Sequence, residues 1–124
     1  MTASGNSFPK TERLKRASQF RQILKNAHSV REEGVNLYFL GNSSADKSRL
    51  GIVVSRRVFK HASDRNRVKR AVREFFRLRK SKFRASFDFV VRVVDGSKLF
   101  ENNRLQEILT HLFERAKVFQ RGTD

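Results

Sequence analysis

The most densely charged segment of this sequence runs from Arg65 to Lys82, where nine lysines and arginines accompany one acid, Glu74. On a helical wheel at about 100° per residue, its apolar side chains fall on one side and most of its cations on the other. The apolar side holds Val68, Ala71, Val72, Phe75 and Phe76, and the other holds Arg65, Asn66, Lys69, Arg70, Arg73 and Arg77. Clustered guanidinium and ammonium groups bind phosphate oxygens, so the segment predicts a helix that binds a polyanion.

The same row of cations destabilises an isolated helix. Lys69, Arg73 and Arg77 repeat at i, i+4, where like charges cost about 0.2–0.5 kcal/mol per pair. Arg65 and Arg67 lie near the helix N-terminus, the positive end of the helix dipole, which is unfavourable for cations. An anionic partner would relieve both penalties, and the free N–H groups of a helix N-terminus favour phosphate. A soluble basic helix without a partner is the alternative interpretation.

The whole chain is strongly basic, and its charge is unevenly distributed. Its 124 residues include 28 lysines and arginines against 12 acids, a formal net charge of +16. Residues 1–82 hold 21 of these cations and six of the acids, whereas residues 83–124 hold seven and six. This clustering is typical of a polyanion binder, with nucleic acid the first candidate and an anionic membrane surface the second. Membrane docking is disfavoured because the core needs the apolar face of the basic helix, and no apolar run approaches the roughly 18 residues of a membrane span.

Several kinds of catalytic chemistry are excluded or disfavoured by the residues present. There is no cysteine, which removes disulfides, thiolate metal sites and cysteine nucleophiles and fits a cytoplasmic protein. The acids are scattered without a metal-ligand motif, and there is no glycine-rich phosphate loop. His28, His61 and His111 are far apart in the sequence, although folding could bring two of them together. We predict that the protein alone neither binds a metal or cofactor nor cleaves RNA.

Length and hydrophobic periodicity predict one α+β domain. The expected elements are a helix over 17–26, strands over 35–40 and 50–55, a helix over 64–80, a strand over 86–94 and a helix over 103–117. Ser18 and Asp64 are the expected N-caps of the first two helices. The polar residues and single proline of 1–12 predict a flexible segment before a domain over 13–119, with a short tail over 120–124.

The segment Arg65-Asn66-Arg67-Val68-Lys69-Arg70 resembles the Arg-Asn-Arg signature of the bacterial ribonuclease P protein subunit. Further segments resemble that family in order and at suitable spacing, namely Phe8-Pro9-Lys10, Arg13-Leu14, Phe20, the run from Gly51 to Arg57, Asp88-Phe89-Val90-Val91 and His111-Leu112-Phe113. The resemblance extends over residues 8–119. It implies an α+β two-layer sandwich of order α-β-β-α-β-α, with an unusual left-handed βαβ crossover that no pattern in the sequence reveals.

The resemblance also implies a function. Proteins of this family are RNA-binding partners of a catalytic RNA, and the holoenzyme is an endonuclease that removes the 5′ leader from precursor tRNA. The expected partners are therefore the ribonuclease P RNA and precursor tRNA, with no obligatory protein partner. Catalysis is expected from the RNA subunit, with Mg²⁺ held through RNA and no cofactor bound by the protein.

Two sets of site residues follow from the resemblance, residue by residue. The expected contacts to the RNA subunit are Arg65, Asn66, Arg67, Lys69, Arg70 and Arg73. The expected leader-binding cleft lies between the first helix and the sheet and comprises Phe20, Leu24, Tyr38, Arg56, Arg57, Arg92 and Phe119. Leu24 stands where the family often has a second aromatic ring, and Val94-Asp95 stand where many members have a basic pair. Leader affinity or preference is therefore expected to differ in this protein.

Two other functions are compatible with a basic helix. A non-catalytic ribosomal or assembly protein would share the helix and the fold, but it would gain no affinity from a single-stranded leader on tRNA. A DNA-binding protein would place the helix in a major groove, although Asn66 is the only amide on its polar face suited to base readout. Phe20 and Tyr38 also have a plainer interpretation, as ordinary core aromatics.

Overall fold

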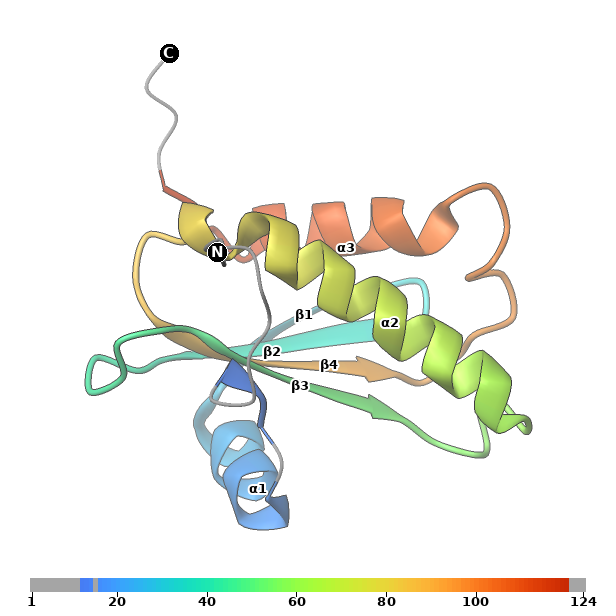
Figure 1. Cartoon of the computed structure of the whole chain (residues 1–124), viewed down its shortest axis with the longest axis horizontal. Helices are drawn as coiled ribbons and strands as arrows, with labels where there is room; N and C mark the ends of the chain where they lie inside the picture. The colour runs from blue at the N-terminus through green and yellow to red at the C-terminus, as the bar shows by residue number, and fades with distance from the viewer. Residues whose placement is uncertain (1–11, 15, 121–124) are drawn as a thin grey trace, which may run out of the picture.

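The computed structural model describes residues 12–14 and 16–120. Its elements are α1 (Ala17–Asn26), β1 (His28–Glu32), β2 (Val35–Gly41), β3 (Arg49–Val54), α2 (Ala62–Arg79), the 3-10 turn η2 (Lys80–Lys82), β4 (Phe87–Val93) and α3 (Arg104–Arg115). Helices α2 and α3 cover one face of a four-stranded sheet, and α1 lies against part of the other face (Figure 1). The predicted α+β class is confirmed, and α1 adds a partial third layer. None of the helices in the described ranges is long and apolar enough to cross a bilayer.

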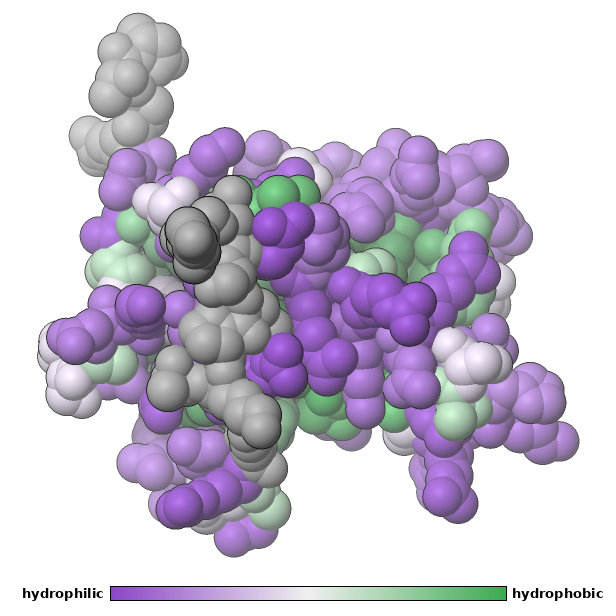
Figure 2. All heavy atoms as spheres, in the orientation of Figure 1, coloured by the Kyte–Doolittle hydropathy of each residue, from purple (hydrophilic) through white to green (hydrophobic). Residues whose placement is uncertain are grey.

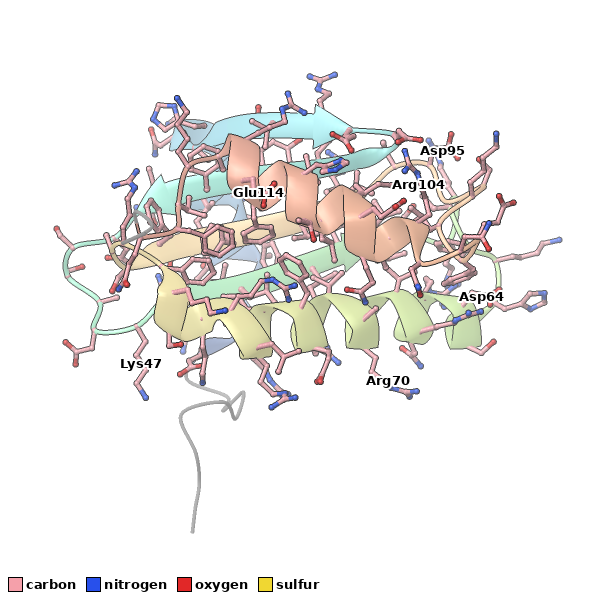
Figure 3. The ribbon with its side chains drawn as sticks, turned by 90° about the horizontal axis from the view of Figure 1, so that it is seen from above. Lys47, Asp64, Arg70, Asp95, Arg104 and Glu114 are labelled. Carbon is pink, nitrogen blue, oxygen red and sulfur yellow. The ribbon has the colours of Figure 1, made fainter. Side chains whose placement is uncertain are left out.

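The sheet is mixed, with strand order β1-β2-β4-β3. Strand β2 pairs antiparallel with β1 and with β4, whereas β3 and β4 are parallel neighbours. Parallel neighbours need a crossover, and here α2 supplies it from above the sheet. Figures 1 and 3 together show that this β3-α2-β4 crossover is left-handed, as the resemblance implied.

Strand β1 was missed by the sequence analysis, so the predicted order α-β-β-α-β-α lacks one strand. Val30 is the only apolar residue of β1, which lies at the sheet edge and shows no alternating pattern. A two-residue turn joins β1 to β2, because Glu32 pairs with Val35 and both Glu33 and Gly34 have positive φ. That combination is typical of a type I′ hairpin turn, in which glycine is favoured at the second position.

Strand β4 supplies side chains to both faces of the sheet. Phe87, Phe89, Val91 and Val93 belong to the large core beneath α2 and α3, whereas Val90 belongs to a smaller cluster beneath α1. The large core is rich in phenylalanine, with the Phe83 and Phe89 ring centroids 4.8 Å apart and those of Phe89 and Phe113 5.1 Å apart. This packing fixes both α2 and α3 on the sheet.

Both expected helix N-caps were wrong. Helix α1 begins after Arg16, whose backbone N–H donates to Gln19 Oε1 at 3.1 Å, so Ser18 lies within the first turn. Helix α2 begins after His61, which makes no side-chain capping bond, so Asp64 also lies within the first turn. Asp64 still favours the helix there because an acid interacts well with the positive end of the dipole.

The chain before α1 is anchored at Glu12. This residue, which the sequence placed in a flexible segment, is only 1% exposed. Its Oε1 lies 2.9 Å from Lys80 Nζ, and its Oε2 lies 3.6 Å from Lys47 Nζ. Most of the predicted flexible segment, with Phe8-Pro9-Lys10, lies outside the described residues, as does most of the predicted tail.

A buried ion pair joins the two parallel strands. The guanidinium of Arg49 on β3 donates to both carboxylate oxygens of Asp88 on β4, each at 2.8 Å, and Asn42 Nδ2 donates to the same carboxylate at 3.1 Å. The hydrogen bond to Asp88 raises the pKa of Arg49 above its usual value, against the opposing effect of burial. Asp88 is only 5% exposed, so its carboxylate oxygens depend on these partners for their hydrogen bonds.

We expect Asp88→Ala to lower the free energy of unfolding by about 1–3 kcal/mol, because it leaves Arg49 and Asn42 without their shared acceptor. Equilibrium unfolding in urea measures the change. The matched control is Glu74→Ala, which removes the surface partner of Arg77 and is expected to have a much smaller effect. Equal effects of the two variants would contradict a structural role for the buried pair.

Candidate nucleic-acid interface

The outward face of α2 is rich in cations. Asn66, Arg67, Arg70 and Arg73 are exposed, whereas Val68 and Val72 are buried against the sheet. Hydrophilic side chains cover most of the α2 region of the molecule (Figure 2). Arg70 projects away from α3, on the side opposite Arg104 (Figure 3). We call the set Asn66, Arg67, Lys69, Arg70 and Arg73 the α2 face.

The cations of the α2 face differ in how they are held. Arg70 forms no hydrogen bond or ion pair with any described residue. Partial burial, and to a smaller extent the nearby guanidinium of Arg13, lower the pKa of Arg73 from its usual value. Arg77, one turn further on, is instead tied to Glu74, with Nη2 2.6 Å from Oε2. The α2 face therefore has cations ready for an external anion.

Arg65 and Arg67 make contacts that the sequence did not suggest. Arg65 Nη1 donates to the backbone oxygens of Phe59 at 2.8 Å and Lys60 at 3.1 Å. The Arg67 guanidinium lies over the Phe100 ring, 3.9 Å from its centroid. Arg65 is half-buried and holds the turn before α2, so part of its donor capacity is already used within the protein.

A second polar surface lies on the opposite face of the sheet. Strand register places Arg31, Asn36, Arg92 and Val53 side by side in one row across all four strands. The next row along the strands comprises Ser29, Tyr38, Val90 and Gly51. In the third row, Leu40, Asp88 and Arg49 line a pocket with residues of α1. Helix α1 lies under that end of the sheet (Figure 1), and Arg31 and Arg92 of the first row are exposed.

Helix α1 borders the exposed part of this sheet face. Phe20 is half-buried and packs against the cluster that contains Tyr38 and Val90. Leu24 is 37% exposed on the same helix, so it offers apolar surface without an aromatic face. Tyr38 is half-buried, and its hydroxyl accepts a long hydrogen bond from Asn36 Nδ2 at 3.4 Å. We call this region, between α1 and the first row, the α1 groove.

The structure brings most of the predicted cleft residues to the α1 groove. Arg92 lies in its first row, and Arg56 and Arg57 are exposed in the turn that follows Val54 at the same end of the sheet. Phe119 does not belong there, and its placement in the cleft was wrong. It stacks on Phe83 with centroids 5.5 Å apart, within the core beneath α2 and α3.

Two residues of the α1 groove were not foreseen. Arg31 and Asn36 belong to the first row, and neither was singled out because β1 was not predicted and the register was therefore unknown. An alternation of polar with apolar residues in 35–40 was the only signal available, and it marks Asn36 as facing away from the large core. Arg31 carried no such signal.

The described residues show no site for a metal ion. No group of three or more His, Cys, Asp or Glu side chains gathers in the part of the chain described. The histidines have separate neighbours: His28 packs on Phe39, His111 Nδ1 lies 2.7 Å from Glu32 Oε2, and His61 precedes α2. The cations of α2 suit the binding of a polyanion.

Comparison with known proteins gives the same result from sequence and from structure. The profile of the family described as Ribonuclease P matches residues 8–117. The ribonuclease P protein component of Staphylococcus aureus strain Mu3 is 36% identical over 112 residues, which cover 90% of this chain and 96% of that protein. A solved structure of the S. aureus protein superposes with a TM-score of 0.81 and 35% identity, over 90% of this chain and 100% of that one. The Thermotoga maritima protein gives 0.72 and 36%, over 90% and 99%.

We expect Gly51→Ala to displace the Phe20 ring and to weaken binding of a short single-stranded RNA. A Cβ at position 51 would lie 2.5 Å from two carbons of Phe20 and 3.1 Å from Leu14 Cβ, too close for either group to stay in place. Fluorescence anisotropy with a labelled oligonucleotide measures the affinity. Gly41→Ala is the matched control, since nothing lies within 4 Å of its added Cβ. Equal affinity of both variants would show that Phe20 does not form the wall of an RNA-binding groove.

Proposed function

The chain belongs to the bacterial ribonuclease P protein family, and we propose that it binds RNA through two separate surfaces. The α2 face binds the catalytic RNA subunit, and the α1 groove binds the 5′ leader of precursor tRNA. The protein is thus the non-catalytic component of an endoribonuclease, and the bond is cleaved by the RNA. The observation that carries this division is that the sheet separates the two surfaces.

The α2 face suits a folded RNA rather than a single strand. Its cations form a row along one rigid helix, and such a row can follow a phosphate backbone without reading bases. Arg70 makes no hydrogen bond or ion pair with a described residue, so its guanidinium can bind phosphate oxygens without first breaking an internal contact. Binding of this kind releases counterions, so affinity is expected to fall steeply as salt rises.

The α1 groove suits a single strand. Tyr38 and Phe20 supply aromatic surface, on which an unpaired base stacks for about 1–3 kcal/mol with little sequence preference. Arg31 and Arg92 lie in the row beside Tyr38 and can hold the phosphates on either side of a stacked base. A protein that serves many precursors needs loose recognition of this kind.

The two surfaces give the protein two effects on cleavage. Cations on the α2 face neutralise phosphates of the RNA subunit, so its active site forms at a lower Mg²⁺ concentration. The Mg²⁺ ions that the reaction needs are held through RNA, whose phosphate oxygens are hard ligands of the kind that Mg²⁺ prefers. Leader contacts in the α1 groove exist only before cleavage, so they favour precursor over product.

We expect precursor tRNA to be cleaved accurately at low Mg²⁺ by a bacterial ribonuclease P RNA together with this protein, and by neither component efficiently alone. Arg70→Ala is expected to weaken binding of the RNA subunit and to reduce the slope of log affinity against log salt by about one. Filter binding over a salt series measures both. Arg104→Ala removes the same charge from the opposite side and should leave the slope unchanged. Cleavage by the protein alone would overturn the assignment of catalysis to RNA.

We expect Tyr38→Leu to lower the affinity of the holoenzyme for precursor tRNA by about tenfold while leaving the affinity for mature tRNA unchanged, because it removes one stacking surface for the leader. Binding to precursors with and without a leader measures the difference. Arg70→Ala provides the contrast, since it is expected to weaken both complexes by the same factor. Equal losses for both tRNAs in Tyr38→Leu would show that the α1 groove does not hold the leader.

A further inference from the structure

Two phenylalanines connect the N-terminus of α2 to the loops on either side of it. Phe59, in the turn before α2, stacks on Phe100, in the loop before α3, with centroids 5.3 Å apart and planes inclined by 28°. The Arg67 guanidinium covers the Phe100 ring, 3.9 Å from its centroid. Arg65 holds the backbone of the same turn through the oxygens of Phe59 and Lys60. We call these four side chains, Arg65, Arg67, Phe59 and Phe100, the loop brace.

The loop brace is closely packed where the two loops meet. A Cβ on Gly96 would lie 2.2 Å from Phe59 Cζ, so the glycine lets the ring lie directly against the backbone of the loop before α3. Phe59 and Phe100 are both partly buried and pack on the large core. The turn that carries Arg56 and Arg57 is therefore held against α2 from two sides, by its carbonyl oxygens and by a ring.

The contact with Phe100 orients Arg67 without using its hydrogen-bond donors. A guanidinium that stacks on a ring uses its flat face, and its N–H groups point outward in the plane. Among the described residues Arg67 donates no hydrogen bond, so all its donors are available for a phosphate. A side chain already fixed in orientation loses less conformational freedom on binding. Lysine replaces it poorly, because an ammonium group can lie over a ring but has no flat face that stacks on it.

We propose that Phe59 and Phe100 are positioning residues for binding of the RNA subunit, an inference that rests on the proposed function of the α2 face. Phe100 acts by holding Arg67 in one orientation, and Phe59 acts by stacking on Phe100 and keeping that ring in place. Neither ring is a contact to RNA itself. A positive charge at position 67 is then not enough for full RNA affinity. Phe100 raises the affinity indirectly, because it orients the arginine that contacts the RNA.

The test measures affinity for ribonuclease P RNA at fixed salt, with Phe100→Leu, Phe100→Tyr and Arg67→Lys. Phe100→Leu removes the ring and keeps an apolar side chain, and Arg67→Lys keeps the charge and removes the flat cation. Each is expected to weaken binding by about three- to tenfold, whereas Phe100→Tyr keeps the wild-type affinity. The double variant Arg67→Lys/Phe100→Leu is expected to bind the RNA as tightly as the weaker-binding single variant, because both substitutions remove the same contact.

A control separates this effect from general loss of stability. Phe119→Leu removes another partly buried ring, stacked on Phe83 and remote from both RNA surfaces, and is expected to keep wild-type affinity. Melting temperatures of the free proteins are recorded alongside. In the wild type, the side-chain protons of Arg67 are expected upfield in the NMR spectrum because they lie over a ring, and Phe100→Leu removes that shift.

Wild-type affinity in Arg67→Lys would overturn the proposal even if Phe100→Leu failed to fold. If the loss of affinity in the double variant equals the product of the two single-variant losses, the proposal is also overturned, since the two residues would then act independently. Failure of the wild-type protein to bind the RNA would instead contradict the proposed function. If Arg70→Ala weakens binding while Arg67→Lys and Phe100→Leu do not, only the loop brace is wrong.

Discussion

Packing of α2 against the sheet is the interaction on which the rest of the structure depends. Val68, Val72, Phe75 and Phe76 are each at most 1% exposed, and burial of a large apolar side chain contributes about 1.5–3 kcal/mol. Repulsion between like charges at i, i+4 on the exposed face costs about 0.2–0.5 kcal/mol per pair. The buried stripe therefore outweighs the charge repulsion several times over. A helix that would be unfavourable alone is held straight with its cations on the surface.

The sheet beneath α2 separates the α2 face from the α1 groove, the two surfaces that we propose bind RNA. Strand β4 contributes alternately to both sides, with Phe89 in the large core and Arg92 in the first row of the α1 groove. The turn between β3 and α2 connects the two faces of the sheet. It begins after β3, which contributes Val53 to the α1 groove, and it carries Arg56 and Arg57 toward α2. A precursor whose leader lies in the groove can thus remain close to RNA bound on the α2 face.

How much could be predicted from the sequence depended on whether the signal was local. The 3.6-residue period of α2 fixes which residues are buried, and all four buried residues were assigned correctly. Strand β1 has a single apolar residue at a sheet edge, so no periodic pattern could reveal it, and without it the neighbours of Asn36 were unknown. The left-handed crossover came from the resemblance alone, because handedness has no signature in hydrophobic spacing. Phe119 was misplaced because its contact with Phe83 depends on how the chain returns after α3.

The arginines near the start of α2 show why residue type and spacing did not reveal their individual roles. Arg65 is held by two backbone oxygens, Arg67 by the flat face of an aromatic ring, and Arg70 by no described residue. These are three different degrees of order in the free protein, from a side chain that already uses donors internally to one free to adapt. RNA binding needs both kinds, because a fixed cation sets the register on a phosphate backbone and an adaptable one follows local irregularity. These arginines therefore differ in role because their neighbours differ. Some of those neighbours lie on loops outside the helix, and a helical wheel does not include them.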